Sequence, residues 1–202
     1  MKHPNIIKII CHDIGRHLGC YGVKSINSNA IDTLAKNGIL FKNSFATSPG
    51  CSPSRAAIAT GMYPHNTGVL GLAHAHFGWS LDKKINHIAK YFSKNGYTSI
   101  LFGLQHVTYH EKTLGFNKIF PERPADQVLR NITKIIDNKI FKKPFYAEVN
   151  FFEPHRPFDY GGIKPDKSKG VYIPKYIPKN IYSRREFAEM QGAIKKMDNT
   201  VF

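Results

Sequence analysis

Cysteine is scarce in this sequence of 202 residues, which contains only Cys11, Cys20 and Cys51. An odd number of widely spaced cysteines does not resemble the dense disulfide frameworks of small secreted domains. The sequence therefore favours a reducing compartment and a fold that is held together by its apolar core. A hydrophobic share of 42% is sufficient for such a core and argues against an intrinsically disordered chain.

Long apolar runs are also missing. The first run, Ile6 to Cys11, is short and contains Lys8. A membrane-spanning helix needs about 20 apolar residues, and the apolar part of a signal peptide needs about 7–15. We therefore expect a soluble, cytoplasmic protein without a membrane partner.

Acidic residues are few. There are 14 Asp and Glu residues against 29 Lys and Arg residues, which gives a formal net charge of +15. Such a field attracts anions, including nucleic acids, acidic lipids and sulfated or phosphorylated substrates, although a lysine-rich solvated surface produces the same charge. The sequence has no arginine-rich arm, zinc-finger spacing or aromatic RNA-binding signature, so we expect no nucleic-acid partner.

Apolar segments alternate between two periodicities along the chain. The patterns predict strands at 5–11, 39–45, 97–102 and 145–152, and helices at 28–36, 52–60, 82–94, 125–138 and 184–201, with Ser28 and Ser183 as helix caps. Residues 153–182 are rich in proline and glycine and predict a long irregular loop of functional importance. Strands separated by helices indicate an α/β fold, with a mostly parallel sheet between helices, in one domain over residues 1–202.

The most informative segment is Cys51-Ser52-Pro53-Ser54-Arg55, where a loop leads into a predicted helix. Proline suits the first helical turn, because its missing N–H would have no partner there. The unpaired N–H groups and the positive end of the helix dipole make such a start an anion-binding site, to which Arg55 adds a permanent charge. From the residues alone, a small buried cysteine before a helix remains the alternative.

This segment resembles the Cys-x-Pro-Ser-Arg signature of the sulfatase family, in which the cysteine is oxidised to formylglycine. Further segments that are similar to the family follow the same order: Pro4-Asn5-Ile6-Ile7, Asp13-x-Gly15, Leu18–Gly22, Ala56–Gly68, Gly103-x-x-His106 and Pro154-His155-Arg156. His106-Val107 and Pro154-His155-Arg156 look most like the N-sulfoglucosamine (heparan N-) sulfatases. The resemblance covers nearly all of this chain but only the front part of the family's catalytic domain.

The resemblance implies an alkaline-phosphatase-like, truncated α/β fold and hydrolysis of a sulfuric ester or sulfamate on a sulfated small molecule or glycan. It assigns the nucleophilic geminal diol to formylglycine at Cys51, with Arg55 holding that diol. It assigns breakdown of the sulfated intermediate to His106, and sulfate binding or protonation of the leaving group to His155. It also implies a maturation partner, either a formylglycine-generating enzyme or an anaerobic sulfatase-maturating enzyme.

The family also implies a divalent metal, for which Asp13, His12 and modified Cys51 are the candidate ligands. Calcium is the expected ion. His12 stands where most sulfatases have an aspartate, however, and imidazole is a poor calcium ligand. Magnesium, a softer metal, or a His12 that only hydrogen-bonds beside the site remain open.

Two departures from the family pattern favour other interpretations. Leu104 stands where the family usually has a sulfate-binding lysine, and no Asp-Asn-Gly follows Arg156. The pair Asp198-Asn199 lies in a predicted helix, so we do not take it as a substitute. Both departures favour a truncated, non-catalytic sulfatase-like fragment that at most binds anions. A phosphoryl or phosphonate ester hydrolase of the same superfamily is a separate alternative.

Overall fold

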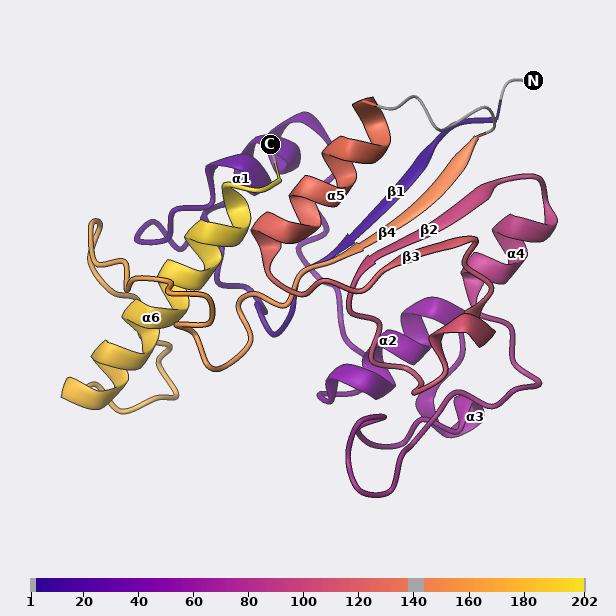
Figure 1. Ribbon diagram of the computed structural model, residues 1–202. Helices are drawn as coiled ribbons and strands as arrows, with labels where there is room; N and C mark the ends of the chain where they lie inside the picture. Colours follow the sequence, from indigo (N-terminus) through magenta and orange to yellow (C-terminus); the bar gives the residue numbers. More distant parts are fainter. Residues whose placement is uncertain (1–2, 138–143, 202) are drawn as a thin grey trace. The chain divides into compact units, whose positions relative to one another are not determined.

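The computed structural model describes residues 3–137 and 144–201 (Figure 1). It divides into two compact units. Of the described residues, the first unit takes those up to Ile10, Phe45–Arg123 and Arg130–Asn150. The second takes Cys11–Ser44, Pro124–Leu129 and those from Phe151 onward. Each unit is described separately below.

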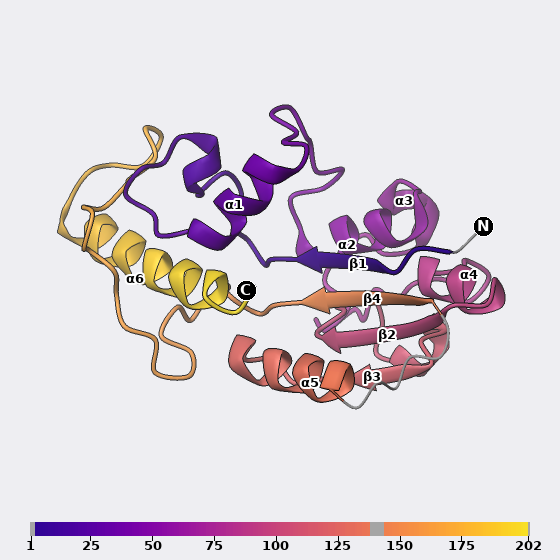
Figure 2. The same ribbon diagram turned by 90° about the horizontal axis from the view of Figure 1, so that it is seen from above.

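A four-stranded parallel sheet forms the centre of the first unit (Figure 2). Its order is β1-β4-β2-β3, and the strands are β1 (Ile6–Ile10), β4 (Phe145–Asn150), β2 (Thr98–Gly103) and β3 (Lys118–Phe120). The register pairs Ile10 with Asn150, and Asn150 with Gly103. The carboxyl ends of these three strands therefore lie level, which is where open α/β sheets place their functional groups.

Burial differs between the middle and the edge of the sheet. In β2 and β4 every residue after the first is buried, as expected for strands covered on both faces. In β1 alternate residues are exposed, with Ile7 at 59% and Ile9 at 41%. The strand predicted at 5–11 is confirmed as the edge strand β1, and one of its faces is open among the described residues.

Helices flank the sheet of the first unit. In Figure 1, α2 (Cys51–Thr60), α3 (Pro64–Thr67) and α4 (Ile88–Lys94) lie on one side of it. The part of α5 (Ala125–Asp137) from Arg130 onward lies on the other side. The core on the α2 side is formed by Ala56, Val69, Leu81, Val107 and Leu114. The predicted α/β arrangement with a mostly parallel sheet is confirmed.

A buried ionic group joins the two strands β1 and β4. Lys8 pairs with Glu148 in register, and Lys8 Nζ lies 2.6 Å from Glu148 Oε2, which also accepts a hydrogen bond from the Tyr146 hydroxyl at 2.8 Å. Burial raises the pKa of Glu148, but the charges of Lys8 and His87, with hydrogen bonds from Lys8 and Asn150, together outweigh burial and hold the pKa below its ordinary value. His87, at the start of α4, is 2% exposed, and burial lowers its pKa to about 4.

The second unit is built on two helices, α1 (Asn29–Asn37) and α6 (Ile181–Asp198), and the short 3-10 helix η1 (Gly19–Tyr21). Its core contains Leu18, Ile26, Met190 and Ile194. Residues 153–180 are irregular apart from one isolated bridge, as the sequence predicted.

The start of α1 is capped by a side chain that is distant in the sequence. The two carboxylate oxygens of Asp198 accept the backbone N–H groups of Ala30 and Ile31, each at 2.9 Å. Ser28 holds the N-cap position, but its hydroxyl accepts from the Gly19 N–H and caps nothing. Ser28 therefore stands at the predicted cap position, but the predicted hydrogen bond from the helix to its side chain is wrong. The Asp198 carboxylate of α6 accepts the N–H groups of the helix start instead. The prediction that Asp198 lies in a helix is confirmed.

The predicted strand at 39–45 is wrong. These residues are irregular, and Ile39, Phe41 and Phe45 are 84%, 69% and 88% exposed. No strand among the described residues lies alongside to pair with them. β-branched and aromatic residues favour a strand only where a neighbouring strand supplies hydrogen-bond partners and side chains to pack against.

The predicted helix at 82–94 begins late, at Ile88. His87 Nδ1 accepts the Ala89 N–H at 3.1 Å, which fixes the helix start there. Upstream, the Asp82 carboxylate accepts the Lys84 N–H at 2.8 Å and holds a local turn. Such short side-chain bonds compete with helical ones, which explains the shortened element.

Other boundaries shift by a few residues. Helix α2 begins one residue early, at Cys51 itself, and α6 begins at Ile181, where Asn180 and Ser183 form a capping box. The predicted end of α5 at Asn138 lies outside the described residues. The sequence did not predict β3, α3 or the 3-10 helix η2 (Glu111–Leu114). Within residues 3–137 and 144–201, no helix is both long and apolar enough to cross a bilayer.

Candidate functional site

Cys51 is the first residue of α2, with Gly50 as its N-cap. Arg55 follows one turn later and is 6% exposed. Residues four apart lie on the same helix face, so the thiol and the guanidinium share one side of the first turn. The helix start thus supplies a sulfur, a buried permanent charge and the positive end of the dipole in one place.

His106 follows the end of β2, where the chain passes close to the backbone of Asn150. Only a glycine, Gly103, allows this close passage. Gly103 has φ +81°, and a Cβ on it would stand 1.9 Å from the backbone oxygen of Asn150. No other residue fits there without moving the neighbouring strand. The close approach of the Asn150 backbone therefore explains the glycine of the Gly-x-x-His segment.

The turn after Gly103 is held by one side chain. Gln105 Oε1 accepts the Val107 N–H at 2.7 Å, and Gln105 Nε2 donates to the Thr108 backbone oxygen at 2.6 Å. His106, between these anchors, has φ +59°. The turn is thereby fixed with the imidazole projecting from it.

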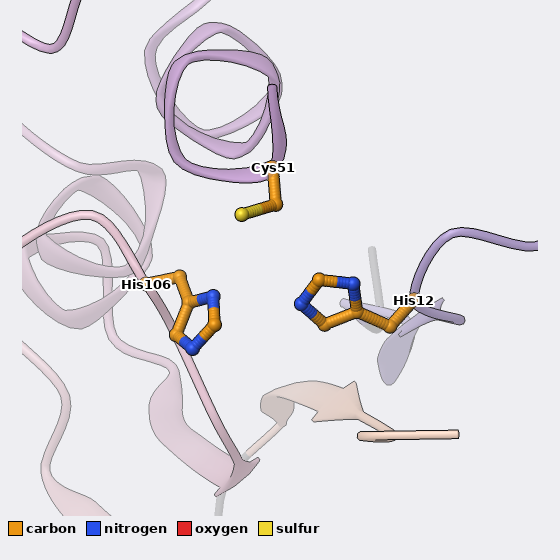
Figure 3. A group of neighbouring side chains, drawn as sticks. All are labelled: His12, Cys51 and His106. Atoms are coloured by element: carbon orange, nitrogen blue, oxygen red, sulfur yellow. The ribbon is translucent and has the colours of Figure 1, made fainter. Parts of the chain in front are cut away.

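Cys51 and His106 are brought together in the first unit. The Cys51 side chain points toward the His106 ring (Figure 3), and the Cys51 sulfur lies within 4.8 Å of a ring nitrogen of His106. Two of the predicted catalytic residues thus meet although they are far apart in the sequence. His12, also drawn in Figure 3, belongs to the second unit and is described with its own neighbours below.

His74 joins this group although no sequence pattern pointed to it. Its ring lies 4.6 Å from that of His106, centroid to centroid, and its side chain is exposed. The adjacent backbone is fixed, because the Ala73 N–H donates to Ser52 Oγ at 3.1 Å and both residues are buried. As one of ten histidines, outside every motif, His74 could be found only from the fold.

Leu104, which stands where the resemblance leads one to expect a lysine, is 6% exposed. Its side chain is part of the interior. The substitution is therefore accommodated as an apolar core residue, with no charge to place beside the sulfur of Cys51.

The second unit gathers three other predicted residues, beginning with His12 and Asp13. His12 is 2% exposed, and its backbone N–H donates to the Glu153 backbone oxygen at 3.2 Å. Its Nδ1 lies 2.9 Å from Asp13 Oδ1. Asp13 has φ +52°, and its carboxylate is exposed.

His155 completes this group from a distant loop. Its backbone N–H donates to the Phe152 backbone oxygen at 2.9 Å, and its ring Nε2 lies 3.8 Å from Asp13 Oδ2. The ring centroids of His155 and His12 are 4.5 Å apart. One ligand atom from each of His12, Asp13 and His155 lies within 4.8 Å of the others, so the three could hold a metal ion.

Glu153 anchors the loop that carries His155. Its carboxyl is 1% exposed, and Oε1 accepts the N–H of Ala125 at 3.1 Å, at the start of α5. Burial raises the pKa of this carboxyl above its ordinary value. Sequence reasoning did not single out Glu153, because its role depends on a helix start that is distant along the chain.

Backbone strain marks one residue in each group. Among the described residues, Asp13 and His106 are the non-glycine residues with positive φ. Such conformations cost about 1–3 kcal/mol and persist where the surroundings impose them, often at functional sites. Both residues were predicted site members from the sequence.

Each unit therefore assembles part of the predicted site. The first places Cys51, Arg55 and His106 together and adds His74. The second places Asp13 beside two imidazoles. A thiol with a buried cation and an imidazole suits covalent chemistry on an anion, and the second group suits a divalent cation.

Comparison with known proteins places the chain in a family. The sulfatase family model matches residues 4–201. The chain is 27% identical to human N-sulphoglucosamine sulphohydrolase, an alignment that covers 98% of this chain and 45% of that protein. It is 32% identical to an ulvan-active sulfatase of Formosa agariphila, covering 89% of this chain and 35% of that one. The chain thus spans less than half the length of these curated relatives.

Solved structures share the fold. A protein from a study of glycosaminoglycan metabolism by Bacteroides thetaiotaomicron superposes with a TM-score of 0.80 at 19% identity, over 98% of this chain and 56% of that one. The phosphonate monoester hydrolase of Agrobacterium radiobacter superposes with a TM-score of 0.72 at 17% identity, over 98% and 58% of the two chains. Because the family match runs through nearly every described residue, including Cys51, His106 and His155, the chain belongs to the sulfatase family.

Proposed function

We propose that this protein hydrolyses a sulfuric ester or sulfamate on a sulfated carbohydrate, through a formylglycine made from Cys51 and with a divalent metal. The observation that carries the proposal is the arrangement of Cys51, Arg55 and His106 in the first unit. Cys51 begins α2, Arg55 is buried one turn later, and the His106 imidazole lies within 4.8 Å of the sulfur. The family of the chain supplies the chemistry that such a group would perform.

The proposed reaction needs two oxygens on the side chain of residue 51. Hydration of the formylglycine aldehyde makes a geminal diol, one oxygen of which attacks the sulfate sulfur while the carbohydrate oxygen or nitrogen leaves with a proton. The second hydroxyl then loses its proton, reforms the C=O bond and expels sulfate. Arg55 holds the diol, and His106 takes the proton in this second step.

A divalent metal in this chemistry lowers the pKa of the attacking hydroxyl and shields the sulfate oxygens. The expected calcium does not fit the residues found beside Asp13. Calcium takes about 6–8 oxygen ligands, and two of the three side chains that come together at Asp13 are imidazoles. We therefore assign no step to the metal or to His155, whose ring belongs to that group.

The substrate class is supported by the relatives. One is named for N-sulphoglucosamine and another for ulvan, and a structural neighbour comes from glycosaminoglycan metabolism. These names describe those proteins, and we extend to this chain only their shared class, a sulfated carbohydrate. The maturation partner in this proposal is a formylglycine-generating or anaerobic sulfatase-maturating enzyme.

Co-expression with a formylglycine-generating enzyme tests the proposal. The Cys51 peptide should become lighter by mass spectrometry, having lost the elements of hydrogen sulfide and gained one oxygen. The matured protein should then cleave an aryl sulfate, and Cys51→Ala should do neither. A thiol that stays unmodified in a folded chain would rule out this mechanism.

One observation favours a second candidate, a phosphonate or phosphoryl ester hydrolase. The fold of the Agrobacterium phosphonate monoester hydrolase covers 98% of this chain. Relative turnover of aryl sulfate and aryl phosphate by the matured protein separates the two reactions. Absence of both activities in a modified, folded chain would favour the non-catalytic, anion-binding alternative.

A further inference from the structure

Aromatic side chains gather on an irregular segment of the first unit. Between α3 and α4, residues 68–87 contain neither helix nor strand (Figure 1). This segment carries Phe77, which is 81% exposed, and Trp79, which is 37% exposed. Tyr109, on the connection between β2 and η2, is 58% exposed. Single exposed apolar residues are ordinary, whereas a contiguous exposed patch marks an interaction site.

The two segments that carry these rings are packed against each other. Gly78 stands between Phe77 and Trp79, and a Cβ on it would lie 3.4 Å from Tyr109 Cε2. The Gly78 backbone is therefore in contact with the Tyr109 ring. The Tyr109 hydroxyl also donates to the Ala75 backbone oxygen at 3.4 Å. The three aromatic side chains thus belong to one surface.

Turns and close contacts hold the segment in this conformation. The Ala75 N–H donates to the Leu72 backbone oxygen at 3.1 Å, and the Gly78 N–H donates to that of Ala75 at 2.8 Å. The Trp79 indole lies against the backbone of Gly71, where a Cβ would stand 2.6 Å from the indole Cδ1. Because the backbone is fixed in this way, little conformational entropy is lost when a ligand binds.

The same segment borders the candidate active site. On one side the Ala73 N–H donates to Ser52 Oγ, in the first turn of α2. On the other side the Leu81 N–H donates at 2.9 Å to the backbone oxygen of Val107, the residue directly after His106. The aromatic surface is therefore continuous with the group of side chains that carries the proposed reaction.

A sugar ring matches such a surface. Its faces present C–H groups, which contact the electron-rich face of an aromatic ring favourably, while its hydroxyl groups stay at the rim in water. We infer that Phe77, Trp79 and Tyr109 form a subsite for a sugar ring of the substrate whose sulfate group lies at residue 51. The inference rests on the proposed function for the class of ligand, and it adds how the carbohydrate part is held.

Trp79 provides a direct probe, because it is the only tryptophan of the chain. The test uses the full chain with Cys51→Ala, which binds substrate without turnover. This protein is titrated with an N-sulfated glucosamine disaccharide, with a sulfated oligosaccharide from ulvan, and with inorganic sulfate. Tryptophan emission reports contact with the subsite, and calorimetry gives the affinity.

Variants in the same background separate ring contact from a structural effect. Phe77→Ala and Tyr109→Ala each remove a ring, whereas Phe77→Tyr and Tyr109→Phe each keep one. Phe45→Ala is the matched control, since Phe45 is 88% exposed in the same unit but outside the segment. Circular dichroism melting shows that each variant is folded.

We expect at least one of the two saccharides to shift the Trp79 emission to shorter wavelength, and inorganic sulfate to leave it unchanged. Phe77→Ala and Tyr109→Ala should each weaken binding of that saccharide about 3–10-fold, as loss of one aromatic contact predicts. Phe77→Tyr, Tyr109→Phe and Phe45→Ala should bind it as tightly as the parent chain.

An emission that neither saccharide changes would overturn the inference, as would equal affinities for Phe77→Ala, Tyr109→Ala and Phe45→Ala. An emission that depends on protein concentration alone would also overturn it, because a second copy of the chain would then cover the surface. A matured protein that cleaves aryl sulfate but responds to neither saccharide would contradict this inference alone. A chain that responds to a saccharide but keeps its thiol at Cys51 after co-expression would contradict the proposed function alone.

Discussion

The ring of His74 lies 4.6 Å from the ring of His106, centroid to centroid, with 38° between their planes. In the proposed function the substrate anion binds at residue 51, beside His106, so we expect the exposed His74 ring to border it. With Leu104 buried in the interior, His74 is the group that we expect to take over contact with the sulfate in the first unit.

Replacing this histidine should weaken catalysis without unfolding the protein. A hydrogen bond to a charged group contributes about 1.5–3 kcal/mol, so His74→Ala should lower kcat/KM for an aryl sulfate about 10–100-fold in the matured protein. His76→Ala is the matched control, since this exposed ring lies against Phe77. Equal rates for the two variants would remove His74 from the substrate site.

Gly103 should tolerate no side chain, for a reason beyond its φ. Gly96 and Gly103 have similar φ values of +85° and +81°, but a Cβ at Gly96 meets nothing within 4 Å, whereas one at Gly103 would meet the Asn150 backbone. Gly96→Ala should cost about 1–2 kcal/mol of unfolding free energy from conformation alone. Gly103→Ala should cost about 1–3 kcal/mol more, because backbone must move. Urea unfolding measures both, and equal losses would refute the close approach.

His87 should make stability depend on pH. Its native pKa of about 4 lies below its ordinary value of 6.5, so the unfolded chain binds more protons between these values. The free energy of unfolding should therefore rise with pH across this window, by about 3 kcal/mol, and the contribution is constant above it. Loss of stability on acidification follows.

The charged neighbours that act on the pKa of His87 are Glu148 and Lys8, and both remain in a His87→Asn variant. Asparagine is a good N-cap, so the helix start is kept while the titrating group is removed. Thermal or urea unfolding from pH 4 to 6.5 should show a shallower slope for His87→Asn than for the unmodified protein. Parallel slopes would show that His87 does not titrate as described.

Much of the fold could be predicted because it depends on local pattern. The apolar runs of β1, β2 and β4, and the helix that follows Cys51, appear as periodicity or as a helix-start signal. The strand at 39–45 failed because its residues have the composition of a strand but no partner, and pairing is a property of the whole chain. The helix at 82–94 began late because of hydrogen bonds that involve Asp82 and His87.

The residues of the candidate site also fall into those that the sequence indicated and those that only the structure revealed. The sequence by itself determined the family and pointed to Cys51, Arg55, His106, His155 and Asp13, because their spacing to neighbouring residues forms motifs that can be read locally. Only the tertiary structure brought His74 against His106, placed Asp198 on the start of α1 and set two imidazoles beside Asp13. These contacts join residues with no common motif, and what a side chain does there is decided by the neighbours that folding supplies.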